Sequence, residues 1–300
     1  MKGFYIILGS LFFILHLSWG AESSVKIDQP ALKLSGGLSL VSAFVARGST
    51  NRPENNKPNI QSMLRLDYNN FYFLYANSKI DYSFKEIQRN TELYQKVASN
   101  LQAQNYSYTD EAYSEKLNNE YEHLVEKEGK TSTWGYFEND LLLGYRSNYN
   151  KLEYDLNFKY LYYHQAKMTN GIEVGLIFKY PLRHEREKIG ISFETYLQDV
   201  YFMNAGDTYM KIIYNTYFEP DIYFNIYTGF SYFNKNGKYV KNTEGMKITD
   251  QSFVYRHTTF ELAHPLNQKI TGWMQYIVGG KNRDGVEQRN MMVAGISYLF

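Results

Sequence analysis

Apolar and polar residues alternate with a period of two along most of this chain. In the stretch 151–165, even positions from 152 to 162 carry Leu, Tyr and Phe, whereas odd positions from 151 to 159 carry Lys, Glu, Asp and Asn. Successive side chains of a β-strand point to opposite faces, so such a strand separates an apolar environment from a wet one. The alternation therefore predicts an all-β protein.

Twelve strands are predicted from this alternation, with ten or fourteen left open because the ends of the sixth to eighth are the least distinct. Most are long enough for a tilted membrane strand of about 9–11 residues. They are expected near 32–47, 60–68, 71–84, 134–146, 151–165, 172–180, 189–199, 207–218, 221–233, 252–263, 269–280 and 289–300.

The connections between these strands sort by length. Those after even-numbered strands are short, such as Asn69-Asn70 and Glu219-Pro220, whereas those after odd-numbered strands include the long segments 48–59, 85–133 and 234–251. Short turns at one end and long loops at the other are typical of a transmembrane antiparallel β-barrel. Two connections, near 167–171 and 203–206, are short exceptions on the long-loop side.

The apolar faces are expected to point to lipid, because closing the sheet gives every backbone group a partner. One conflict remains in the stretch 252–263, where Arg256 shares a face with Val254, Phe260 and Leu262. A midplane Arg facing lipid costs about 2–4 kcal/mol. Arg256 is therefore expected near the outer rim or at a β-bulge. The expected lipid-facing sets are Leu32, Leu34, Leu38, Leu40 and Phe44; Ile172, Val174, Leu176, Phe178 and Tyr180; and Ile222, Phe224, Ile226, Phe230 and Tyr232.

Residues 85–133 lose the period of two and show helical spacing instead. Asp110 is placed to cap a second helix and Gly129 to end it. Two interpretations stay open for this insert. It is a helical hairpin that plugs the barrel or meets a partner outside, or it is a solvated surface loop.

The N-terminal residues 1–20 have one early cation, Lys2, followed by an apolar run from Phe4 to Leu17 and the small residues Ser18 and Gly20. This pattern predicts a cleaved signal peptide, because the run is short for a spanning helix; an uncleaved anchor is the alternative. Residues 21–300 are then expected to form a single barrel domain.

Composition narrows the class of protein further. The chain has no Cys, so an exported protein of this kind must be held by a large core or a closed sheet. A net charge of +1 provides no electrostatic case for nucleic acid. The 30 Tyr and 19 Phe favour strands with one apolar and one wet side.

The chain ends on ISYLF, with Met292, Ala294, Ile296, Tyr298 and Phe300 on one face of the last strand. With the apolar N-terminal segment and the alternating strands, this ending resembles bacterial outer-membrane β-barrel proteins. The resemblance implies that these five residues form the signal read by the barrel insertion machinery. It also implies an outer-membrane location, in contact with lipid and lipopolysaccharide. The strand number is similar to that of small monomeric porins for acidic sugars, although no motif selects that group.

Charged and aromatic residues on the opposite faces are candidates to line a pore. Their signs nearly balance, which permits either a hydrated pore with little ion preference or a closed polar core of paired charges. A barrel of twelve strands lies between small filled barrels and wide aqueous ones, so any pore is expected to be narrow. The candidates are Lys33, Arg47, Arg65, Asp67, Lys79, Glu138, Asp140, Glu153, Asp155, Lys159, Tyr163, Glu173, Lys179, Glu194, Lys211, Tyr223, Tyr227 and Trp273.

The expected function is passive diffusion of small, sugar-like hydrophilic solutes, without catalytic residues, cofactor or metal. Two alternatives stay open: a closed barrel that acts as an adhesin through residues 85–133, and a hydrolase built around His257 with Thr259 and Asp250 nearby. The scattered His residues show no metal-binding spacing. The oligomeric state is left open.

Overall fold

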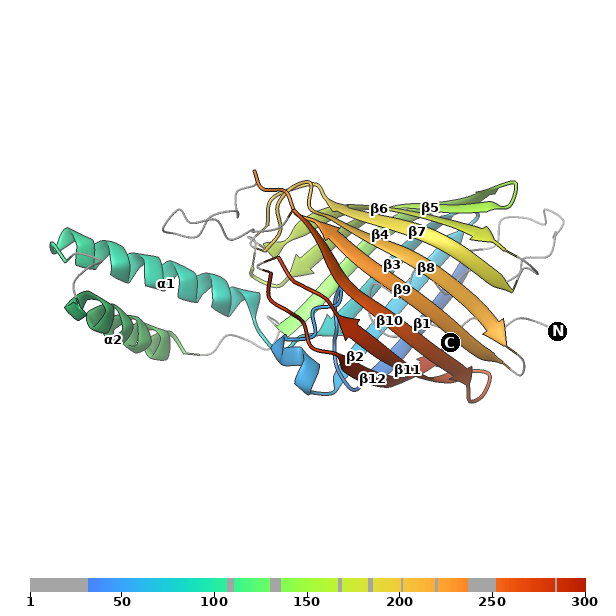
Figure 1. The fold of residues 1–300 in the computed structure, drawn as a ribbon. Coiled ribbons are helices and arrows are strands. Elements are labelled where there is room, and N and C mark those ends of the chain that lie inside the picture. The colour runs from blue at the N-terminus through green and yellow to red at the C-terminus, as the bar shows by residue number, and fades with distance from the viewer. Residues whose placement is uncertain are drawn as a thin grey trace.

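Twelve antiparallel strands close into one barrel in the computed structural model of this chain (Figure 1). The structure describes residues 32–106, 111–129, 136–166, 169–182, 186–200, 202–218, 221–236, 252–283 and 285–300. Each strand pairs with its neighbours in the sequence, and the last pairs with the first. The predicted fold class and the predicted twelve strands are confirmed.

The strand bounds agree with the predicted ones to within a few residues for ten of the twelve. The strands are β1 Lys33–Val41, β2 Asn59–Tyr68, β3 Phe71–Lys79, β4 Phe137–Tyr149, β5 Leu152–Tyr163, β6 Gly171–Pro181, β7 Glu187–Tyr196, β8 Thr208–Phe218, β9 Ile222–Tyr232, β10 Phe253–Pro265, β11 Ile270–Gly279 and β12 Met291–Leu299.

The barrel closes between β1 and β12, where Leu38 lies opposite Tyr298. The C-terminal residue takes part in this seam. The N–H of Phe300 donates to the carbonyl of Gly36, and the N–H of Gly36 donates back to the carbonyl of Phe300, each at 3.1 Å. The Phe300 ring itself is exposed on the outer face. Phe300 thus contributes two backbone hydrogen bonds to the closure of the sheet.

The two faces of the barrel wall reverse the pattern of a soluble protein. Large apolar side chains such as Leu38, Leu143 and Phe158 are more than half exposed on the outside. Polar and charged side chains such as Glu173 and Asp155 are buried inside. Since a closed sheet satisfies all of its ladder hydrogen bonds internally, an apolar exterior of this kind suits a hydrocarbon environment. The fold and its surface define a transmembrane β-barrel.

The insert between β3 and β4 contains two helices, α1 Phe84–Ala103 and α2 Glu111–Glu128. Ser83 caps α1 by accepting a hydrogen bond from the N–H of Glu86, and Gly129, at φ +69°, follows the end of α2 as predicted. The predicted cap Asp110 lies outside the described residues. Figure 1 shows both helices beyond the long-loop end of the barrel, away from its interior.

The two helices pack on each other through Val97, Leu101, Tyr113 and Leu117. Neither of them, nor any other helix in the described ranges, is long and apolar enough to cross a membrane. The helical character expected for this insert is confirmed. The helices project away from the barrel (Figure 1), although Phe84 at the start of α1 packs against Tyr163 of β5, so a plug role for this insert stays a prediction.

Two predicted strands are too long at their C-terminal ends. The first was expected to reach residue 47 and stops at Val41, and Phe44, expected to face lipid, is only 2% exposed. The chain turns into the barrel after Val41, which carries Phe44 inward. The third strand stops at Lys79 because Ser83 begins a helix four residues later.

Several predicted features lie outside the described residues. These are the signal peptide 1–20, the Glu219-Pro220 turn and most of the loop 234–251. The division into a signal peptide and a barrel domain spanning 21–300 stays a prediction.

Candidate functional site: the polar interior of the barrel

Most of the predicted lining residues do point into the barrel. Lys33 lies on the inward face of β1 but is exposed at its end, whereas Asp67, Glu153 and Tyr223 are half-buried. The remaining inward residues are buried: Arg65, Glu138, Asp140, Asp155, Lys159, Tyr163, Glu173, Lys179, Glu194, Lys211, Tyr227 and Trp273.

Lys79 was assigned to the interior, and this assignment is wrong. In β3 the inward residues are Tyr72, Leu74, Ala76 and Ser78, so Lys79 falls on the outer face at the end of the strand. Both faces of β3 are largely apolar, because Leu74 and Ala76 pack inside the barrel. The alternation of this strand therefore does not distinguish its inward face from its outward face.

A buried network of charges crosses the interior between β5 and β8. Glu173 on β6 pairs with both Arg47 and Lys159. Glu194 on β7 pairs with Arg47 at 3.0 Å and lies 3.6 Å from the Nζ of Lys211 on β8. Two carboxylates and three cations thus share one small volume, and each carboxylate touches two of the cations.

Arg47 belongs to the connection between β1 and β2, not to a strand, yet its side chain is buried in this network. Its guanidinium carbon lies 5.3 Å from the ring centroids of both Tyr196 and Tyr209. Burial lowers the pKa of Arg47, but the Glu173 carboxylate, with Tyr196 and Glu194, outweighs it, and the net pKa rises well above its usual value. Arg47 is therefore a permanent positive charge inside the barrel.

A second network occupies the short-turn end of the interior. The Asp67 carboxylate pairs with Arg65 at 2.9 Å and with Arg146 at 2.7 Å. The Arg65 guanidinium carbon lies 4.1 Å from the ring centroid of Tyr72, whose hydroxyl donates to Asp155 at 2.9 Å. These contacts link β2, β3, β4 and β5. The charge balance expected from the sequence is thus realised largely as ion pairs, within one strand, between strands and with Arg47 of the β1–β2 connection.

Arg256 resolves the conflict seen in the sequence of β10. The register of β10 against β9 shifts between Tyr255 and His257, as one extra residue in a strand would require. This bulge, one of the two expected solutions, turns Arg256 inward, where it is 7% exposed. Its Nε, Nη1 and Nη2 donate to the carbonyl of Arg47, the carbonyl of Lys281 and the hydroxyl of Ser49.

Glu261 and His257 of β10 are also buried inside the barrel, and neither was among the predicted lining residues. Glu261 accepts hydrogen bonds from the amides of Asn225 at 2.7 Å and Gln275 at 2.6 Å. His257 is hydrogen-bonded to the hydroxyls of Tyr209 at 2.6 Å and Thr259 at 2.9 Å. His257, Thr259 and Glu261 share one face in the sequence pattern, which indicates that this face points inward. Arg256 falls on the opposite, apolar face in the same pattern, and this conflict obscured the inward assignment.

The bonding of His257 favours a structural role over a hydrolytic one. Both ring nitrogens are engaged and the side chain is only 4% exposed, so a substrate has no access to it in this conformation. Asp250, the third member of the hydrolase alternative, lies outside the described residues. Across the described ranges, no cluster of three His, Cys, Asp or Glu side chains is arranged to hold a metal ion.

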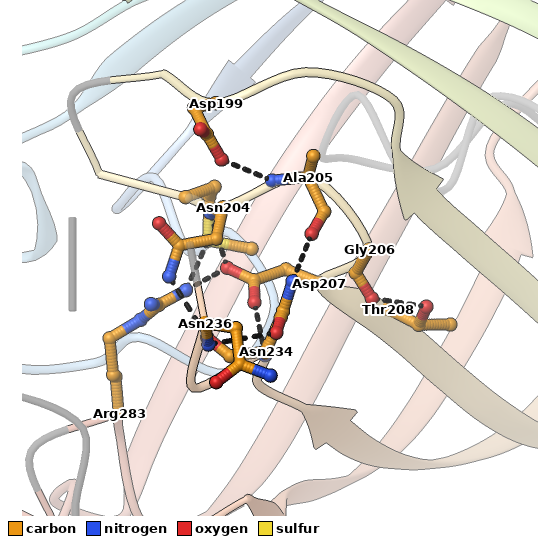
Figure 2. A network of polar contacts seen from close by, with 10 residues as sticks. Asp199, Asn204, Ala205, Gly206, Asp207, Thr208, Asn234, Asn236 and Arg283 are labelled. Carbon is orange, nitrogen blue, oxygen red and sulfur yellow. Dashed lines mark hydrogen bonds and ion pairs between the residues drawn. The ribbon is translucent and has the colours of Figure 1, made fainter. Parts of the chain in front are cut away.

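At the long-loop end, Asp207 holds three connections together (Figure 2). Its carboxylate pairs with Arg283 and accepts the backbone N–H groups of Asn204 and Asn234, each at 2.7 Å. Asn234 returns a bond from its side chain to the carbonyl of Ala205 at 2.7 Å. The β7–β8, β9–β10 and β11–β12 connections are thereby tied into one rim.

Side chains fill much of the remaining interior. An apolar cluster joins Met63, Leu142, Ile213 and Tyr227 with their neighbours from β2, β3, β4, β6, β8 and β9. Beside it is a cavity of about 20 Å³, which is room for one water molecule. Its lining includes Val45, Arg47 and Gly48 from the β1–β2 connection and Lys211, Tyr227 and His257 from the wall.

No protein-family model matches this chain, and no curated protein matches it. Among solved structures, the KdgM porin aligns with a TM-score of 0.49 and 7% identity, over 89% of this chain and 99% of that chain. The NanC porin aligns at 0.46 and 9%, over 89% and 99%. An outer-membrane channel from Pseudomonas putida F1 aligns at 0.41 and 11%, over 92% and 99%. At this level of similarity no residue role or solute is transferred to this chain.

Proposed function

We propose that this protein forms a narrow channel for small hydrophilic solutes in the bacterial outer membrane. The observation that carries the proposal is the reversal of the two faces of a closed barrel. Its exterior exposes Leu38, Leu143 and Phe158, whereas its interior holds Lys159, Glu173 and Lys211. A polar interior inside an apolar wall is what a hydrophilic solute needs in order to cross a membrane without catalysis.

In this proposal, the predicted lining residues form the path along which solutes cross the barrel. Solutes would pass by the polar side chains at the two ends of the interior and then through the network around Glu173 and Glu194. Since each charge there has a partner of opposite sign and the cations exceed the carboxylates by only one, weak selection between the two signs of ion is expected. Tyr209 and Tyr227 add apolar ring faces beside hydrogen-bonding groups, a combination that suits sugar-like solutes.

A low conductance is expected because the described interior is so full. The apolar cluster around Leu142 and Ile213 and the ion pairs around Arg47 leave little open space between the walls. A small conductance with weak ion selectivity therefore distinguishes this channel from a wide aqueous pore.

The outer face of β12 is proposed as the assembly signal. Met292, Ala294, Ile296, Tyr298 and Phe300 all point outward, and Phe300 sits at the closing seam. This face is accessible to an insertion machinery before the barrel is embedded in lipid. The adhesin alternative gains no support, because apolar side chains of the hairpin such as Leu101 and Leu117 are buried within the hairpin and do not offer a partner an apolar surface.

Single-channel recording in a planar lipid bilayer tests the proposal. The purified, heat-modifiable barrel is expected to produce small, discrete current steps with similar permeability to cations and anions. Neutral sugars of increasing size, added on one side, should reduce the steps while they are small enough to enter. If neither the full chain nor variants with shortened long loops ever conduct, the channel function is wrong and the protein is a closed barrel.

A further inference from the structure

The segment 42–58, between β1 and β2, enters the barrel instead of extending away from it. At its start it is still tied to β12, since the N–H of Ser42 donates to the carbonyl of Ala294 at 2.8 Å. Val45 then packs beside Trp273 and Ile277 of β11. Phe44 packs into a different cluster, with Tyr163 of β5 and Tyr196 of β7. Because β5 and β7 are several strands away from β11 around the barrel, the segment extends across the mouth.

Two arginines hold the inward turn of this segment against the wall, whereas Arg289 holds its later part, at Thr50 and Asn56, against the β11–β12 connection. Arg47 reaches from it to Glu173 and Glu194 on the wall. Arg256 reaches from the wall to the segment, with its Nε 3.3 Å from the carbonyl of Arg47 and its Nη2 3.0 Å from the hydroxyl of Ser49. Arg47 therefore anchors the segment through its own side chain, whereas the side chain of Arg256 holds the backbone carbonyl of Arg47 and the hydroxyl of Ser49.

The backbone at the anchor point is held in an unusual conformation. Arg47 has φ +50° and Gly48 has φ +72°, so two successive residues lie in the left-handed region. A Cβ atom on Gly48 would lie only 2.5 Å from the His257 ring. A non-glycine residue persists in this region when its surroundings impose it, and such residues concentrate at functional segments.

The wall does not depend on Arg47 to neutralise its carboxylates. Glu173 keeps Lys159 as a partner, and Glu194 keeps Lys211 at 3.6 Å. Withdrawal of Arg47 would therefore leave both buried carboxylates beside a cation. It would also uncover Tyr209, Thr259 and the small cavity that Val45 and Gly48 now help to close. Two arrangements of the segment are thus compatible with one unchanged wall.

From these contacts we propose that residues 42–58 are a displaceable plug, and that Arg47 and Arg256 latch its inward turn to the barrel wall. In the described conformation the plug closes the long-loop end of the barrel. Its consequence for transport rests on the proposed channel function, but its displacement can be measured without any conduction. The hairpin of α1 and α2, which is the more conspicuous insert, is not part of this proposed plug.

Thiol accessibility tests this directly, because the chain has no native Cys. Thr259→Cys places a single thiol beneath the plug, at a position that is 2% exposed. A small charged methanethiosulfonate reagent should modify it slowly in the otherwise native barrel. Adding Arg47→Ala or Arg256→Ala should accelerate the modification severalfold, because the plug then leaves the mouth.

Arg65→Ala is the matched control, since Arg65 is an equally buried arginine whose ion pair with Asp67 lies away from the plug. It should leave the rate unchanged. Equal rates in all variants, or an acceleration by Arg65→Ala as large as by Arg256→Ala, would overturn the proposal. Heat-modifiable gel migration verifies folding. If an alanine variant fails to fold, Ser49→Ala removes a single latch bond and should still accelerate modification.

Conductance of the same variants separates the two proposals. If thiol access rises while every variant stays silent in a bilayer, the plug is real and the channel function is wrong. If the unmodified chain conducts and the latch variants conduct identically with unchanged thiol access, the channel stands and the plug is wrong. Both proposals hold when Arg47→Ala and Arg256→Ala raise thiol access and conductance together.

Discussion

Arg256 donates a hydrogen bond from its Nε to the backbone carbonyl of Arg47 at 3.3 Å. The two residues are 209 positions apart in the chain, and they meet because a bulge in β10 turns Arg256 inward just where the β1–β2 connection enters the barrel. A residue that looked misplaced on a lipid-facing strand is therefore part of the interior. The contact therefore links β10 to the connection that follows β1.

The ion pairs of Glu173 should contribute strongly to stability. Glu173→Ala leaves Arg47 and Lys159 buried without this partner, and breaking a buried pair in this way costs about 3–5 kcal/mol. Urea unfolding of the barrel in lipid vesicles measures the change in free energy. Glu153→Ala is the control, because the Glu153–Lys188 pair is more exposed, and its loss should cost about 1 kcal/mol or less. Equal losses would contradict the burial argument.

The outer wall should reject charge according to depth. Leu143 lies midway along β4 and is 60% exposed, so Leu143→Lys should destabilise the barrel by about 2–4 kcal/mol in a bilayer. Tyr149 lies at the end of the same strand, where a lysine should cost about 0–1 kcal/mol. The measurement is again reversible unfolding in vesicles. Similar costs at both positions would mean that β4 does not cross the hydrocarbon core as proposed.

Asp207 should control the order of the long-loop rim. Asp207→Ala leaves Arg283 and two backbone N–H groups without their shared carboxylate, a loss of about 3 kcal/mol or more from the local structure. Trypsin should therefore cleave after Arg283 severalfold faster in this variant, because local opening exposes the site. Asp199→Ala, which loses one exposed bond from the N–H of Ala205, is the control. Unchanged cleavage in Asp207→Ala would show that the rim is held by other contacts.

The C-terminal ring should matter more for assembly than for stability. Phe300→Ser keeps the backbone bonds to Gly36 but removes an aromatic side chain that is 59% exposed. Outer-membrane levels in cells should fall strongly, whereas the refolded protein should lose little stability. Phe218→Ser removes another outward aromatic, at the end of β8, and should lower levels much less. Normal accumulation of Phe300→Ser would refute the assembly signal.

The helical hairpin should be dispensable for the barrel. Replacing residues 88–130 with a short Gly-Ser linker removes helices that project beyond the long-loop end and pack mainly on each other (Figure 1). The barrel is expected to fold with unchanged heat-modifiable migration, and any single-channel conductance should stay unchanged. An increased conductance would contradict this expectation, because it would show that the hairpin covers the mouth in solution, as the plug interpretation of this insert requires.

Most of the barrel follows from local sequence pattern. A strand of period two shows which residues share a face without knowledge of its partners, and this was sufficient for the inward placement of Glu138, Lys159 and Glu173. The pattern failed in β3, where Leu74 and Ala76 made both faces apolar and Lys79 was assigned to the wrong one. In β10 the same pattern placed Arg256 on the lipid-facing side, and a bulge was one of the two expected explanations.

What the sequence by itself determined is the all-β class, the strand number, the two faces of most strands and the helical nature of the insert. These depend on residues close together in the chain. Tertiary structure alone decided that the chain turns inward after Val41, that Phe44 is buried, and that Arg47 pairs with Glu173 and Glu194. Each of these contacts joins residues more than a hundred positions apart or depends on the shape of the closed wall. The alternation within a strand does not predict which part of the barrel wall a loop will contact. Those contacts form only when the sheet closes and brings the interior charges within reach of each other.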